Sequence, residues 1–194
     1  IRITEQKKAA TVGEYGAQIL LGYSSTEVKD KNNEKVVNDY VEILKATQPK
    51  YVYIHNLADK HETHVATALK AIKALRLLPP DEQPEKVYGC EVWRDLDWLN
   101  DNEKVLLDCS SHPNLARALS SVFDSQIIGG KRYDMAVEGR RATNATFGKN
   151  VCDTYTGLNY AMDLTPLIKD KNLDIADYVC GFIDRFKDSV KNLL

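Results

Sequence analysis

The residues from Tyr51 to Leu75 constrain the fold more than any other stretch, because they read as a strand, a polar loop and a helix in that order. The strand is the β-branched and aromatic run Tyr51–Ile54, which stops at His55. The helix is rich in alanine and repeats apolar residues at helical spacing: Val65, Ala68, Leu69, Ile72 and Leu75. Ligands of an open α/β sheet bind beyond the carboxyl ends of its strands. The loop between this strand and this helix is therefore the predicted site.

Three of the chain's four histidines lie in this loop or just inside the helix. Two of them, His61 and His64, are three positions apart, which puts them on one face of a helix about one turn from each other. One imidazole can then hold a metal while the other contacts whatever the metal binds. The histidines of a His-Glu-x-x-His motif are four apart, so Glu62 is not predicted to act as a metalloprotease base. Because the motif is short, an alternative is that His61 caps the helix or pairs with Asp59, and that His64 is an ordinary surface or partly buried residue.

Longer runs of the chain resemble the PIG-L/LmbE-like superfamily of zinc-dependent N-deacetylases. The runs that carry the resemblance are HNLADKHETHVATAL, VYGCEVWRDLDW and ALSSVFDSQI. The family's His-Pro-Asp-His type motif is matched by His61–His64. Its later Asp-hydrophobic-Ser strand end and its Ser-Gln pair are matched by Asp108–Ser110 and Ser125–Gln126. The resemblance extends over most of the chain and implies a single LmbE-like α/β domain over residues 1–194.

The alternation of strands and helices predicts a three-layer α/β domain with a mainly parallel sheet, and the resemblance implies that this domain is Rossmann-like. Family members open with a strand that ends in a motif like Ala-His-Pro-Asp-Asp-Glu, and no such motif occurs here. We therefore expect that an N-terminal piece, with two of three zinc ligands and the general base, precedes Ile1.

The resemblance also implies roles for five residues of the chain. His64 is the expected zinc ligand, and His61, as an imidazolium, stabilises the oxyanion and donates a proton to the leaving amine. Asp59 orients His61, His55 lines the substrate pocket, and Arg94 binds substrate. For Arg94 an alternative is a surface ion pair with a neighbouring aspartate, and His55 is equally interpretable as structural. The implied substrate is an N-acetylated amino sugar or its conjugate, and the implied activity is removal of the acetyl group.

A competing hypothesis is a non-catalytic sugar-binding or scaffold α/β domain with an incomplete metal site. A further alternative is a hydrolase with another metal and another substrate. Family members often assemble as homo-oligomers, so the resemblance implies a homo-oligomer as well. The four cysteines are far apart and form no Cys-x-x-Cys pair, which suits small buried residues in a reducing cytoplasm rather than zinc ligands.

Composition excludes two classes of partner. Hydrophobic and charged contents of 43% and 28% are those of a globular protein. A formal net charge of -2 gives no basic footprint, so nucleic acid is not an expected partner. No apolar run approaches the ~20 residues that a membrane-spanning helix needs.

The remaining elements follow from periodicity and from turn residues. We expect helices at 3–21, 33–47, 113–127 and 174–193, and strands at 23–29, 87–93, 105–108 and 158–164. Residues 150–160 form a predicted polar loop, from which Tyr155 or Tyr160 reaches the substrate. The charge-rich segment 131–146 is interpretable mainly as a solvated helix face. An alternative is that residues 129–133 form a flexible lip over a pocket, and Arg140 and Arg141 are candidates to meet an anionic part of a substrate.

Overall fold

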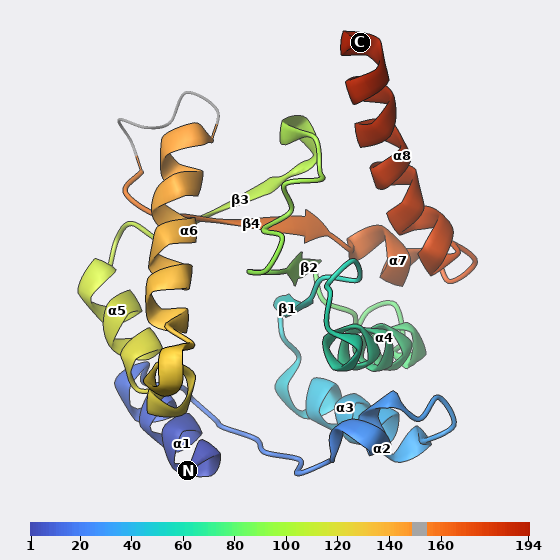
Figure 1. Cartoon of the computed structure of the whole chain (residues 1–194). Coiled ribbons are helices and arrows are strands. Elements are labelled where there is room, and N and C mark those ends of the chain that lie inside the picture. The colour runs from blue at the N-terminus through green and yellow to red at the C-terminus, as the bar shows by residue number, and fades with distance from the viewer. Residues whose placement is uncertain (149–154) are drawn as a thin grey trace. The chain divides into compact units, whose positions relative to one another are not determined.

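A computed structural model describes residues 1–148 and 155–194 of the chain (Figure 1). These residues divide into two compact units, and each unit is built from two stretches of chain. Unit 1 consists of Ile1–Gly22 and Leu106–Asn159, and unit 2 consists of Tyr23–Val105 and Tyr160–Leu194. The single domain expected over residues 1–194 stays a prediction. The first five residues of the predicted polar loop 150–160, Cys152 among them, fall outside the described residues.

Unit 2 contains the strand, loop and helix of the opening stretch. The strand is β1, Tyr51–His55, and the helix is α4, Glu62–Leu77. The other elements wholly within this unit are α2 (Ser25–Lys29), α3 (Glu34–Thr47), β2 (Lys86–Cys90), η1 (Asp101–Glu103), α7 (Thr165–Lys169) and α8 (Ile175–Leu193). Side-chain caps begin two of these helices: Asn33 accepts a hydrogen bond from Lys35 N–H at the start of α3, and Asp174 accepts one from Asp177 N–H at the start of α8.

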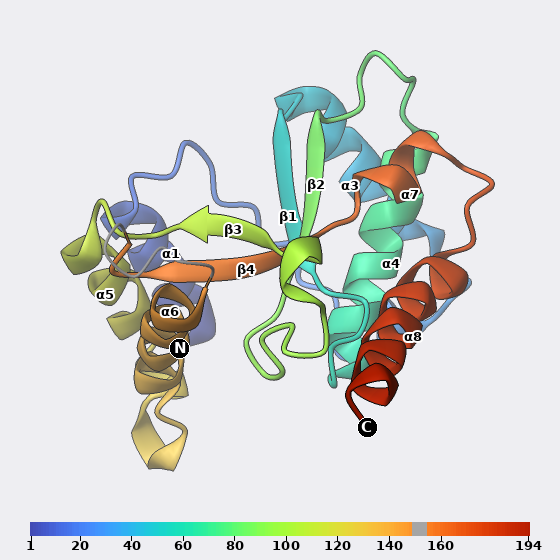
Figure 2. The same ribbon diagram turned by 90° about the horizontal axis from the view of Figure 1, so that it is seen from above.

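The strands form a mixed sheet in the order β1-β2-β4-β3, where β3 is Val105–Asp108 and β4 is Leu158–Asp163. Strands β1 and β2 are parallel and in register from Tyr51 opposite Lys86 to His55 opposite Cys90; Figure 2 shows them side by side. Strand β4 runs antiparallel to β2. The α/β class is therefore confirmed, whereas a mainly parallel sheet is not. What matters for the site is that β1 and β2 end at the same edge, so the loops after them are neighbours.

The hydrophobic core of unit 2 packs helix α4 against the strands. Ile72 and Leu75, predicted to lie on its apolar face, are fully buried, and they pack in one cluster with Val87 of β2 and Met162 of β4. Leu164, Leu167 and Ile168, within or beside α7, complete the cluster and are also inaccessible to solvent. Burial of side chains of this size contributes about 1.5–3 kcal/mol each relative to exposure. The first turn of α4 is thereby held at the carboxyl end of β1.

Unit 1 contains three α-helices among its described residues: α1 (Arg2–Val12), α5 (Pro113–Ser121) and α6 (Tyr133–Phe147). Two short 3-10 segments, η2 (Asp124–Gln126) and η3 (Ile128–Gly130), connect α5 to α6. The carboxylate of Glu5, which is 3% exposed, accepts hydrogen bonds from Ser125 N–H at 2.7 Å and from Ser125 Oγ–H at 2.6 Å. Ser125, the serine of the predicted Ser-Gln pair, thus holds α1 in place in this unit.

Four of the predicted elements differ clearly from the structure. The helix expected over 3–21 ends at Val12, because Gly13 caps it and Glu14 adopts a left-handed φ of 51°. The strand expected over 23–29 is wrong: Ser24 and Glu27 form a capping box that begins α2. The helix expected to reach residue 127 ends at Ser121, and the strand expected to reach residue 93 ends at Cys90.

Among the helices of the described residues, none combines the length and the apolar character required to cross a membrane.

Candidate metal centre

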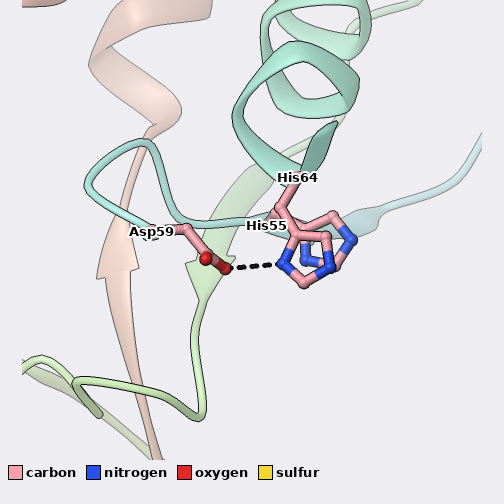
Figure 3. A group of neighbouring side chains, drawn as sticks. All are labelled: His55, Asp59 and His64. Atoms are coloured by element: carbon pink, nitrogen blue, oxygen red, sulfur yellow. Dashed lines mark hydrogen bonds and ion pairs between the residues drawn. The ribbon is translucent and has the colours of Figure 1, made fainter. Parts of the chain in front are cut away.

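One short segment supplies the densest group of potential metal ligands among the described residues. His55 ends β1, Asp59 lies in the following loop, and His64 lies in the first turn of α4. One ligand atom from each of the three lies within 4.8 Å of the others. Figure 3 shows the three side chains converging from the strand end, the loop and the helix.

Asp59 organises this group through two hydrogen bonds. Its Oδ1 accepts from His61 N–H at 2.8 Å, and its Oδ2 lies 2.8 Å from Nδ1 of His64. The Asp59 side chain is only 2% exposed. Burial on its own raises the pKa of Asp59, but these hydrogen bonds and the neighbouring imidazoles outweigh burial and lower the pKa below its ordinary value. Because an ionised carboxylate can only accept, the proton of this hydrogen bond lies on Nδ1 of His64, which leaves Nε2 as the ring nitrogen that can face a metal.

His55 lies flat against His64. The two imidazole rings are stacked, with 4.0 Å between their centroids and 4° between their planes. Desolvation by burial is the main cause that lowers the pKa of His55, and the adjacent His64 adds to it. His55 is therefore neutral at physiological pH, which is the form of imidazole that binds a metal.

His61 stands beside the group without joining it. It is the N-cap residue of α4, yet its side chain makes no capping hydrogen bond. Its ring lies 4.9 Å from that of His64 and 5.2 Å from that of Trp93, centroid to centroid. Within the described part of the chain, no hydrogen bond to its ring nitrogens is found. The Asp59 carboxylate thus bonds the backbone N–H of His61 and the ring of His64, and its role in orienting the His61 ring stays a prediction.

The loop after β2 forms the other side of this site. Nη1 of Arg94 donates to the carbonyl of Ala58, directly before Asp59, so this contact ties the two loops together. The Arg94 side chain is exposed, and it bonds a backbone carbonyl rather than forming the surface ion pair of the alternative interpretation. Lys60 lies over the ring of Trp93 at 4.7 Å. Trp93 is 39% exposed and presents a flat aromatic surface next to His61.

Glu91 is the residue of this loop that the sequence predictions missed. It is 6% exposed; its Oε1 accepts from Arg94 N–H, and its Oε2 has no hydrogen-bond partner among the described residues. Burial, with the nearby charges of Asp59 and Asp95, raises the pKa of Glu91. The sequence predictions missed its position directly after β2 because they extended this strand to residue 93.

Asn56 and Gly89 set the geometry at the base of the loop. The buried Asn56 side chain accepts from Ala58 N–H at 2.8 Å, which turns the chain sharply after β1. Asn56 N–H donates to the carbonyl of Cys90, which continues the ladder to β2. A Cβ at Gly89 would lie 3.2 Å from Nδ2 and 3.3 Å from Cα of Asn56, so glycine permits this close approach.

The other residues named from the sequence lie elsewhere. His112 is the N-cap residue of α5 in unit 1. Tyr160 is 7% exposed within the core of unit 2 and lies under Lys104, so it is a packing residue. Tyr155 belongs to unit 1, as do Arg140 and Arg141 in α6.

Neither a protein-family model nor a curated protein matches the chain. A solved structure, that of the conserved protein TT1542 from Thermus thermophilus, is similar to it. The TM-score is 0.58 with 17% sequence identity, and the match covers 89% of this chain and 77% of that chain. At this identity the likeness shows the fold alone: the chain is an α/β protein.

Proposed function

We propose that the chain is a zinc-dependent hydrolase that removes the acetyl group from an N-acetylated amino sugar or its conjugate. The observation that carries the proposal is the convergence of His55, Asp59 and His64 within 4.8 Å, next to the imidazole of His61. Two histidines and one carboxylate are a donor set that catalytic zinc sites use.

The chemistry of the three side chains suits zinc, which binds histidine nitrogen and aspartate oxygen at ~2.1 Å. One ligand atom from each of them lies within 4.8 Å of the others. The lowered pKa of His55 leaves its imidazole neutral, and the lowered pKa of Asp59 leaves its carboxylate ionised. When bound, zinc supplies a Lewis acid that polarises an amide carbonyl and lowers the pKa of a water to about 7.

The chain's own residues then divide the remaining work. Asp59 fixes the orientation of the His64 ring through its Oδ2. The ring nitrogens of His61 are available to donate to the carbonyl oxygen as it gains negative charge, and then to pass a proton to the leaving amine. Trp93 offers the apolar face of a sugar a surface to pack on, and the exposed Arg94 offers its remaining donors to sugar hydroxyls.

Further expectations from the resemblance accompany the proposal. They are a Rossmann-like three-layer fold with a mainly parallel sheet, homo-oligomerisation, and a cytoplasmic location. The parallel pair β1–β2, with the site at its carboxyl end, supports the first of these.

Zinc titration of single-histidine variants tests the proposal. We expect His64→Ala to abolish zinc binding and His55→Ala to weaken it at least about tenfold, because each removes a ligand. His61→Ala should keep the zinc and lose release of acetate from N-acetylglucosamine conjugates by about 100-fold or more. His112→Ala is the matched control, since this histidine lies in unit 1, and it should change neither quantity.

Calorimetry with zinc and an assay of acetate release separate the outcomes. Equal loss of zinc in the His61→Ala and His64→Ala variants would contradict the division of roles. Sugar binding with neither zinc binding nor acetate release would support the non-catalytic binding domain instead. Tight binding of a metal other than zinc, with release of a different product, would support the alternative hydrolase.

A further inference from the structure

A cavity of about 240 Å³ lies within unit 1, apart from the candidate metal centre. Helix α5 contributes Pro113, Ala116 and Arg117 to its wall, and α6 contributes Glu138 and Arg141. Cys109, Thr156 and Gly157 line it as well. The cavity holds about eight times the ~30 Å³ that one water occupies in the liquid, so it has room for a small organic molecule.

Among the described residues, the charges of the cavity wall are paired except at Arg141. Arg117 Nε donates to Glu138 Oε1 at 2.6 Å. Asp134, which also lines the cavity, accepts two hydrogen bonds of 3.2 Å from Arg132. The Nε of Arg141, in contrast, is buried and has no hydrogen-bond partner in the part of the chain that the structure describes. Arg141 is therefore the charged side chain of the wall that has an unsatisfied donor among the described residues.

A buried donor on a charged group is costly when it has no hydrogen-bond partner. The base of the Arg141 side chain lies close to Gly157, where an added Cβ would be 3.7 Å from Arg141 Cβ. A carboxylate or a phosphate would satisfy Arg141 with charge-assisted hydrogen bonds, and arginine forms these in a two-pronged geometry. Pro113, Ala116 and Ala142 give the cavity an apolar side that suits a short carbon skeleton.

We propose that this cavity is a binding site for a small organic anion, whose carboxylate or phosphate group is held by Arg141. The site is independent of the zinc centre proposed in unit 2 and stands or falls separately from it.

NMR titration of the full ¹⁵N-labelled chain tests the site, with inorganic phosphate, malonate and glycerol 3-phosphate as probes. We expect saturable shifts of the Arg141 Nε–H and Gly157 N–H signals with malonate or glycerol 3-phosphate. Arg141→Gln should weaken this binding at least about tenfold, because it removes the charge-assisted hydrogen bonds. Arg140→Gln is the matched control: this arginine precedes Arg141 on α6 but does not line the cavity, so affinity should stay within about twofold.

A second variant tests the cavity without touching the charge. Ala116→Leu fills the apolar side with a residue of similar helix propensity and should also abolish the response to the two organic anions. Equal affinity in the wild type, the Arg141→Gln variant and the Ala116→Leu variant would overturn the site. Shifts that grow linearly without saturation would overturn it as well. A response to inorganic phosphate alone would overturn the organic class of ligand.

Discussion

At the scale of single residues, the buried environment of Glu91 disfavours the negative charge of its carboxylate. Its carboxyl is buried directly after β2, and one of its oxygens has no partner among the described residues. Burial favours the neutral acid and thus raises its pKa in the folded state above the ordinary value of 4.5. Below that value the carboxyl is protonated in both the folded and the unfolded chain. As pH rises through the raised folded-state pKa, the stability that this carboxyl contributed as a neutral acid is lost.

We therefore expect Glu91→Gln to raise the free energy of unfolding at pH 7 by on the order of 1 kcal/mol, since it removes a buried charge. The gain over wild type should shrink as pH falls to 4, where Glu91 itself is protonated. Urea unfolding at both pH values measures this difference. A Glu91→Gln variant that is less stable than wild type at pH 7 would contradict this prediction, because it would mean that the folded protein stabilises the charged carboxylate.

Residue types and their spacing in the sequence were enough to point to the segment that holds the site, but not to its internal pairing. Three-residue spacing placed His61 and His64 on one turn, and strand composition placed His55 at the end of β1. The partner of the Asp59 side chain depends on how the loop folds back over α4, which spacing does not encode. Glu91 was missed for a related reason, because its burial arises from the packing of two separate loops. The capping box at Ser24, by contrast, was readable locally and was overlooked.

At the scale of elements, the contact between β2 and the loop after β1 decides how the site is held. Gly89 lies in the middle of the sheet, opposite Ile54 on one side and Met162 on the other. An added Cβ would lie 2.8 Å from Cδ1 of Leu164 and 3.3 Å from Cα of Asn56, so a side chain there pushes on the residue that begins the loop.

We expect Gly89→Ala to lower the free energy of unfolding by about 1–3 kcal/mol, as overpacking does, and to weaken zinc binding because the loop shifts. Gly139→Ala is the matched control, because a Cβ at this position of α6 meets no atom within 4 Å. That control should be stabilised by up to about 1 kcal/mol through helix propensity. Thermal unfolding and zinc titration measure both effects, and a Gly89→Ala variant as stable as wild type would contradict the close approach.

At the scale of the whole molecule, two compact units are each assembled from two stretches of chain. In unit 1 the two stretches meet where the buried carboxylate of Glu5 accepts both hydrogen bonds from Ser125. The hydrogen bond from the Ser125 hydroxyl, and after it the one from the Ser125 N–H, hold the pKa of Glu5 below its ordinary value.

We expect Glu5→Ala to speed amide hydrogen exchange in α1 and α5, because Ser125 N–H loses its partner and α1 its anchor. Exchange in α3 and α4, which belong to unit 2, should be unchanged. Mass spectrometry of exchanged peptides measures both regions in one experiment. An equal increase in both would mean that the units open together.

The candidate metal centre, in contrast to the units, comes from one continuous segment of ten residues: His55 ends β1, Asp59 lies in the loop, and His64 lies in the first turn of α4. Its geometry is therefore a matter of loop length, and a single inserted or deleted residue between Asn56 and Lys60 would misalign every donor at once. Evolution can keep or discard such a centre in one step, and an engineer can transplant it as one peptide onto another strand–loop–helix of matching length.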